Sequence, residues 1–269
     1  MCVLVLSFFV IAGLNKATAA PPAKPLPPAV ARIGAKPAVE VAAIKRAPKD
    51  LPVITYRQAP SGFPADPGRT DIVPITEGLH ATRRLPLYDA PGGTPRAFLP
   101  PGIRGVEVTV PIVERQPGWV AVLLPSINRR IGWLPATGWQ SRSLRDQLVV
   151  RLARHELVWL HYGVRQESWT VATGSDRTPT PLGRTFVLGR TETEGSVYGG
   201  LDALVLGAVP DDRDAVAPGL RDAHTGIHSW HSASAFGRSV SNGCLRVPRD
   251  GQRTLLDHIG PGTPVVVLN

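Results

Sequence analysis

The side chain with the clearest chemical potential is Cys244, in the run Ser241-Asn242-Gly243-Cys244-Leu245-Arg246. The other cysteine, Cys2, stands at the front of an apolar segment with the composition of an export leader, so a processed chain keeps one thiol. Exported proteins meet an oxidising compartment, where cysteines usually pair as disulfides. A thiol with no partner in its own chain and histidines upstream is therefore a candidate nucleophile.

A cysteine attacks as the thiolate, so Cys244 needs a base or a positive microenvironment. Three histidines precede it closely: His224, His228 and His231. His228 is favoured because Gly226 and Ile227 can place it at the end of a strand, 16 positions before the cysteine. His224 and His231 stay as alternative bases, and otherwise as surface residues of a loop.

The residues before the thiol are small, which suits acyl transfer. The run leaves the amides of Asn242, Gly243 and Cys244 free to point at a developing oxyanion, the donor arrangement that this chemistry demands. We therefore expect an exposed thiolate in an acyl-transfer pocket at this turn.

The case for export rests on residues 1–20. An apolar stretch at 3–14 is followed by the small-x-small pattern Ala17-Thr18-Ala19, which predicts a signal peptide. The stretch is short for a membrane span, so a membrane anchor is expected only if the leader is retained. The predicted location is extracellular, in the cell envelope.

The charge of the chain is +9 and is scattered, with no dense block of basic residues apart from Arg83-Arg84 and Arg129-Arg130. Outside the cell the available polyanions are envelope polymers and lipid headgroups, so we expect no nucleic-acid partner. The histidines outside the motif lack cysteine or histidine partners at metal-ligand spacing, so we expect no metal, and no phosphate or dinucleotide fingerprint indicates a cofactor.

Residues 21–68 are rich in proline and alanine. Because proline fixes φ and removes backbone donors, this stretch is predicted to be an extended, semi-rigid linker with no packed core.

Residues 69–140 contain short apolar strands separated by turns, which predicts a small β-barrel module. The expected strands begin at Leu85 and cover 106–110, 118–125 and 131–134. The tryptophans of this region could form a ligand-stacking face, but we expect them to fill the core. They are Trp119, Trp133 and Trp139.

Residues 146–268 are also predicted to be β-rich, with one or two short helices, so the whole fold is mainly β. Strands are expected at 147–152, 156–160, 167–174 and 262–268, and a helix at 251–259. Thr178 to Gly183 is interpreted as a proline-fixed structural bend before the strand of Phe186.

The frame TPTPLGRTF, TGIHSW, FGRSVSNGCLRV and GTPVVVL closely resembles the YkuD-type L,D-transpeptidase catalytic domain. The resemblance covers roughly residues 146–268. The segment before it, with GWVAVLLP and IGWLP, is similar to the bacterial Src-homology-like modules found beside cell-wall enzymes. Two positions depart from the common family pattern: Asn242 stands where many members have His, and Ser229 where many have Gly.

The resemblance implies a role for each residue of the motif. Cys244 would be the acyl-enzyme nucleophile and His228 its base, oriented by the Ser229 carbonyl. The amides of Gly243 and Cys244 would form the oxyanion hole. Ser241 and Arg246 would support the turn or the substrate carboxylate, although Arg246 could also simply pair with a surface carboxylate.

The implied reaction is acyl transfer on peptidoglycan stem peptides. The family attacks the L,D bond of a tetrapeptide stem, releases D-alanine and passes the acyl group to an amine, which makes a 3→3 cross-link or attaches a protein to the wall. Carbapenem-type β-lactams are the implied inhibitors. The open alternatives are an L,D-carboxypeptidase that uses water as acceptor and a catalytically silent wall-binding protein. A sortase is disfavoured because its Thr-Leu-x-Thr-Cys strand is missing.

Overall fold

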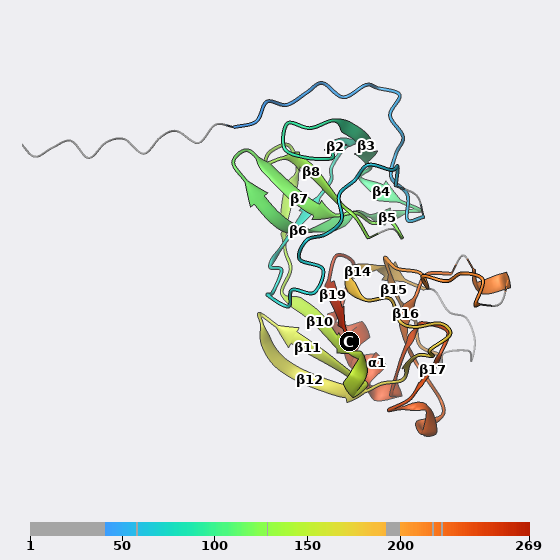
Figure 1. Cartoon of the computed structure of the whole chain (residues 1–269). Coiled ribbons are helices and arrows are strands. Elements are labelled where there is room, and N and C mark those ends of the chain that lie inside the picture. The colour runs from blue at the N-terminus through green and yellow to red at the C-terminus, as the bar shows by residue number, and fades with distance from the viewer. Residues whose placement is uncertain (1–40, 58, 128, 192–199, 217, 222) are drawn as a thin grey trace, which may run out of the picture. The chain divides into compact units, whose positions relative to one another are not determined.

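The computed structural model describes residues 41–57, 59–127, 129–191, 200–216, 218–221 and 223–269 (Figure 1). The predicted signal peptide, Cys2 and the first part of the predicted linker lie outside these residues. No helix within the described ranges has the length and apolar character needed to cross a membrane. The mainly β fold is confirmed, with a single α-helix in the described part of the chain.

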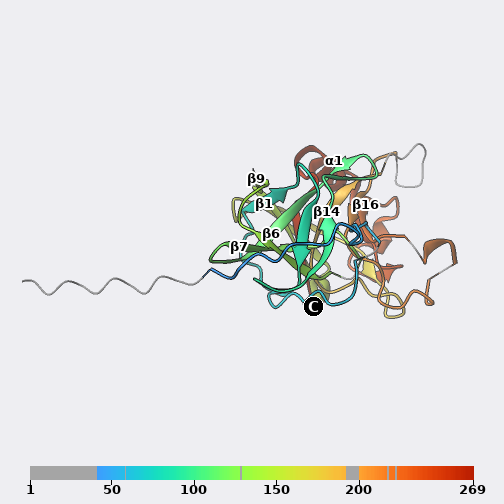
Figure 2. The ribbon, with the colours of Figure 1, turned by 90° about the horizontal axis from the view of Figure 1, so that it is seen from above.

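The first half of the described chain forms a seven-stranded antiparallel sheet in the order β3-β2-β8-β7-β6-β1-β9. In Figure 2 the labels β9, β1, β6 and β7 follow this order. The strands are β1 (Glu77–His80), β2 (Leu85–Tyr88), β3 (Pro95–Leu99), β6 (Thr109–Gln116), β7 (Trp119–Leu123), β8 (Ile131–Pro135) and β9 (Gln140–Ser143). A two-stranded ladder joins β4 (Gly102–Ile103) to β5 (Val106–Glu107).

The prediction of a single strand at 106–110 is wrong, because the chain changes its hydrogen-bonded partner strand at Val108. The Val108 amide donates to Pro101 O, and the Val108 carbonyl accepts from the Ala81 amide. The residues before it pair with β4, and those after it pair with β1.

The tryptophans of this module belong to its core, as predicted. Trp119 is 1% exposed and Trp133 5% exposed, while Trp139 packs half-buried against the same cluster. Tyr88 meets the Trp119 ring edge-on at a centroid distance of 5.1 Å. Burial of such large side chains stabilises a module that has few other residues to bury.

The expectation that the linker has no packed core is wrong for residues 41–68. Ile54 and Phe63 are buried within the core of the seven-stranded sheet. The backbone is also engaged, since Trp119 Nε1 donates to Ala42 O and Tyr88 Oη donates to Lys45 O. Proline content therefore predicted the lack of regular structure but not the packing, because a few apolar side chains suffice to anchor an extended segment.

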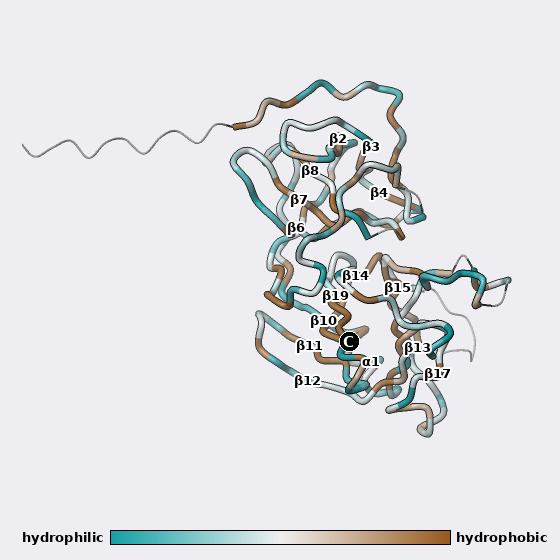
Figure 3. Tube along the Cα trace, in the orientation of Figure 1, coloured by the Kyte–Doolittle hydropathy of each residue, from teal (hydrophilic) through white to brown (hydrophobic). Residues whose placement is uncertain are grey.

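The second half forms an eight-stranded sheet in the order β12-β11-β10-β19-β14-β15-β16-β18 (Figure 1). Its strands are β10 (Asp146–Arg151), β11 (Glu156–His161), β12 (Val164–Thr170), β14 (Gly183–Arg190), β15 (Leu204–Leu206), β16 (Gly226–Ser229), β18 (Leu245–Val247) and β19 (Pro264–Leu268). The pairs β10–β19 and β16–β18 are parallel and the other neighbours antiparallel. Figure 3 shows hydrophobic residues along β10 and β19, near the middle of the sheet.

Shorter elements complete this half. They are β13 (Thr173–Gly174), β17 (Ser239–Ser241), the helix α1 (Arg249–His258) and 3₁₀ turns at Leu152–Arg154, Pro218–Leu220 and Ala233–Ala235. The helix prediction is confirmed, with a start two residues earlier than expected. The strand predicted at 167–174 is divided, because after Thr170 the chain leaves β11 and Ala172 pairs with Arg246.

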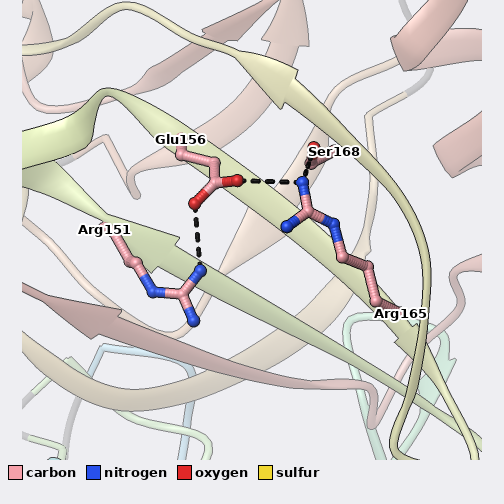
Figure 4. A network of polar contacts seen from close by, with 4 residues as sticks. All are labelled: Arg151, Glu156, Arg165 and Ser168. Atoms are coloured by element: carbon pink, nitrogen blue, oxygen red, sulfur yellow. Dashed lines mark hydrogen bonds and ion pairs between the residues drawn. The ribbon is translucent and has the colours of Figure 1, made fainter.

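An ion-pair network marks the hairpin of β10 and β11 (Figure 4). Glu156 accepts from Arg151 at 2.9 Å and from Arg165 at 3.0 Å, and Arg165 also donates to Ser168. Arg151 and Glu156 are direct partners in the β10–β11 register. The arginines are partly exposed, so each pair contributes at most about 1 kcal/mol, and the network serves to support the register.

Candidate active site

The parallel pair of β16 and β18 brings the histidine and cysteine segments together. Ile227 lies opposite Leu245, and His228 lies opposite Arg246. Parallel neighbours require a crossover connection of a dozen or more residues, which the segment 230–244 supplies. Cys244 directly precedes β18, and a backbone hydrogen bond joins Gly226 to its side chain.

A buried glutamine of α1 supports the histidine strand. Gln252 is fully buried, and its Nε2 donates to Ile227 O at 3.2 Å and to Asp202 O at 2.8 Å. The helix thus holds the peptide next to His228 by a polar contact as well as by packing.

The imidazole of His228 is buried and held in one tautomer. Its Nδ1 lies 2.9 Å from Ser229 O. Because a carbonyl can only accept, Nδ1 carries the proton, and Nε2 is the ring nitrogen that can act as a base. The family resemblance implied this contact with the Ser229 carbonyl, and the structure contains it.

The pKa of His228 is lowered to about 4, mainly by burial; the hydrogen bond to Ser229 opposes this shift, and the Arg246 charge contributes to it. The imidazole is therefore neutral at pH 7 and able to accept a proton.

Cys244 differs from the exposed thiolate expected from sequence. The residue is half-buried, and burial raises the pKa of its thiol, although the Gly226 hydrogen bond and the Arg246 charge pull that pKa down. Both shifts favour the uncharged forms, a neutral thiol and a neutral imidazole, at pH 7.

Ser241 organises the turn that carries the thiol. Its Oγ accepts from the Gly243 amide at 3.1 Å and donates to Cys244 O at 2.6 Å. Gly243 has a φ of +103°, which favours glycine. The Gly243 amide is therefore already paired and not free for an oxyanion, contrary to the expectation from sequence. Asn242 is exposed.

The bend before β14 also holds this turn. Thr180 Oγ1 donates to Gly243 O at 3.0 Å and accepts from the Gly174 amide at 2.9 Å. Thr178 Oγ1 donates to Ser241 O at 3.0 Å. Both threonines are buried. The sequence interpretation of a purely structural bend missed this contact, because no local pattern shows that two segments more than 60 residues apart will meet.

Arg246 stacks on an aromatic ring that sequence analysis did not single out. Its guanidinium carbon lies 3.7 Å from the centroid of Trp230, whose ring meets His228 edge-on at 5.9 Å. In the part of the chain that the structure describes, Arg246 has no acidic partner, so pairing with a surface carboxylate is not observed there. The Arg246 Nε is buried without a hydrogen-bond partner.

The alternative bases lie elsewhere. His224 precedes β16, and its Nδ1 contacts Leu206 O at 2.9 Å. His231 follows β16, is exposed and packs against Trp230. Of the three histidines, His228 is the one on the strand that pairs with β18. Among the described residues no group of three or more His, Cys, Asp or Glu side chains is arranged to hold a metal ion.

The fold and this site define a β-rich domain with a histidine on one strand and a cysteine directly before the adjacent parallel strand. Residues 145–267 match the family model YkuD, the L,D-transpeptidase catalytic domain. The match covers just under half of the chain and identifies residues 145–267 as the part that is similar to this catalytic domain.

Three solved structures illustrate the similarity. L,D-transpeptidase 3 from Mycobacterium tuberculosis, in complex with a faropenem-derived adduct, is 18% identical, with 53% of this chain and 74% of that chain covered and a TM-score of 0.38. LD transpeptidase LdtMt1 in complex with imipenem is 16% identical, with coverage of 71% and 81% and a TM-score of 0.38. An L,D-transpeptidase from Mycobacterium smegmatis is 14% identical, with coverage of 60% and 99% and a TM-score of 0.36. A comparison with curated proteins finds no match.

Proposed function

We propose that the protein is an exported cysteine acyltransferase of peptidoglycan that makes 3→3 cross-links. The observation that carries the proposal is the β16–β18 register, which sets His228 beside the strand that begins just after Cys244. The family match supports the reaction class. The signal-peptide pattern of residues 1–20 supports export to the cell envelope.

In the first half-reaction, Cys244 Sγ attacks the carbonyl carbon of the third stem residue and His228 Nε2 takes the thiol proton. The resulting oxyanion receives a hydrogen bond from the Cys244 amide and is further stabilised by the nearby Arg246 charge. When the C–N bond breaks, His228 returns the proton to the departing D-alanine amine, which leaves a thioester on Cys244.

In the second half-reaction, an amine of a neighbouring stem attacks the thioester carbonyl. His228 Nε2 takes a proton from the attacking amine and gives one to the sulfur as it departs. The products are a new amide bond and the free thiol. Water in place of the amine would give the carboxypeptidase reaction with the same residues.

The test is incubation of the mature protein with a disaccharide-tetrapeptide, followed by mass spectrometry. Formation of dimers with release of D-alanine is the expected result. Neither product, with the protein folded, would reject the proposal. Tetrapeptide shortened by one residue without dimers, even with added amine, would identify water as the acceptor.

A matched pair of histidine variants sharpens the test. His228→Gln removes the proton acceptor and should abolish product formation, whereas His231→Gln changes an exposed imidazole and should leave it near the parent level. Equal losses in both variants would contradict the assignment of His228 as the base.

A carbapenem provides a second probe of the same nucleophile. The thiol should open the β-lactam and give a mass adduct on Cys244, located by peptide mapping. The absence of an adduct under conditions that acylate another family member would count against the assigned nucleophile.

A further inference from the structure

Four arginines surround a cavity of about 210 Å³ that the proposed reaction does not use. Arg69 comes from the segment before β1, Arg129 and Arg130 from the loop before β8, and Arg184 from β14. Asp66 also lines the cavity.

Arg184 and Asp66 are a mutually neutralised pair in the wall of the cavity. Both side chains are buried, and Arg184 Nε donates to Asp66 Oδ2 at 2.7 Å while a terminal nitrogen donates to Oδ1. A Cβ at Gly68 would lie 2.6 Å from the Arg184 guanidinium, so a larger residue there would displace this guanidinium from its present position. This bidentate ion pair has a structural role, and its guanidinium has few hydrogen-bond donors left for a ligand.

Arg129 is held at the cavity in an uncommon conformation. Its φ is +48°, a left-handed value that is unfavourable for a long side chain. The guanidinium donates to Leu182 O and pairs with Asp211 at 2.9 Å. Burial lowers the pKa of Arg129, and the nearby Arg69 charge lowers it further.

Arg69 and Arg130 have no acidic partner among the residues that the structure describes. The cavity therefore gathers four guanidinium groups against the two carboxylates of Asp66 and Asp211. Arg69 and Arg130 are exposed at this site, and like charges gathered in one place repel one another, so a bound anion would relieve that repulsion.

We infer that this arginine cavity is a binding site for an oxyanion group, a carboxylate or a phosphate, with Arg69, Arg129 and Arg130 as its donors. The planar guanidinium matches both groups with paired hydrogen bonds. The volume suits the anionic end of a larger molecule.

One bend of the chain connects the arginine cavity to the turn that carries Cys244. Arg129 contacts Leu182 O in the same bend whose Thr180 contacts Gly243 O at 3.0 Å. A ligand in the cavity therefore lies against the bend that holds the candidate nucleophile. The anion site itself does not rest on the proposed acyl-transfer function.

The experiment is calorimetric titration of the full chain carrying Cys244→Ala, so that no acyl transfer contributes heat and failure of the proposed function leaves the result unaffected. The probes are inorganic phosphate and N-acetyl-D-alanine, with ionic strength held constant by chloride because screening weakens exposed charges. Tighter binding of N-acetyl-D-alanine would indicate a peptide carboxylate as the source, and tighter binding of phosphate a phosphodiester polymer.

The variant Arg69→Gln/Arg130→Gln should weaken binding at least tenfold, the effect expected for lost charge-assisted hydrogen bonds. The control Arg142→Gln/Arg253→Gln removes the same charge from exposed positions outside the cavity and should change binding less than twofold. Absence of binding by both probes, or equal weakening in the two double variants, would overturn the inference.

Discussion

The seven-stranded sheet and the cysteine turn use opposite means of holding their shape. In the sheet, neighbours such as β2–β3, β6–β7 and β7–β8 are hairpins, and the core consists of large apolar side chains. At the turn, β13 and β17 are far apart in sequence and run parallel, and buried hydroxyl groups hold the backbone. The first arrangement supplies stability and the second supplies geometry, so substitutions in the two regions should affect different measurements.

The largest expected effect falls on the reaction alone. Cys244→Ala removes the nucleophile and should lower cross-linking at least a thousandfold, about 4 kcal/mol in the activation free energy. The thermal midpoint should change by only a few degrees, because the lost group is one sulfur. Product mass spectrometry and calorimetry measure the two quantities, and retained cross-linking would contradict the mechanism.

The next effect falls on stability. Trp119→Ala should lower the free energy of unfolding by about 3–5 kcal/mol, because it leaves a cavity in the core and deprives Ala42 O of its donor. Trp139→Ala is the matched control at a half-buried position and should cost much less. Denaturant titration measures the free energy of unfolding of both variants. Similar losses in the two would contradict the placement of Trp119 at the centre of the core.

A third substitution should lower both the stability of the protein and the rate of cross-linking. Thr180→Val keeps the shape but removes the donor to Gly243 O and the acceptor for the Gly174 amide. Two buried backbone groups lose a partner, so we expect a loss of about 2 kcal/mol in stability together with slower cross-linking. Thr170→Val, on an exposed position of β12, is the control. Stability and rate that both match the control would refute the role given to the bend.

The smallest effect is a pH dependence. His228 has a pKa of about 4, so its proton-accepting form predominates above that value and activity should fall about tenfold per pH unit only below pH 4. Burial raises the pKa of Cys244, so alkylation by iodoacetamide should accelerate only at alkaline pH. Fast alkylation at pH 6 would instead indicate a thiolate already formed in the resting site.

Much of the scaffold could be predicted locally. The strands at β7, β8, β11 and β19 and the helix α1 were expected near their observed positions, because alternation and apolar runs set them residue by residue. The divided strands at Val108 and after Thr170 were missed. In both places the chain changes its hydrogen-bond partner without any change in local pattern.

By itself, the sequence determined the mainly β fold, the family frame, and Cys244 and His228 as the candidate pair, because these depend on residue types and short spacings. Only the tertiary structure decided that the Gly243 amide is occupied by Ser241, that Thr178 and Thr180 hold the turn, that Trp230 lies under Arg246, and that four arginines share one cavity. Each of these depends on segments that meet only after folding. Burial, which sets the charge state of the thiol and the imidazole, is likewise a property of the packed chain.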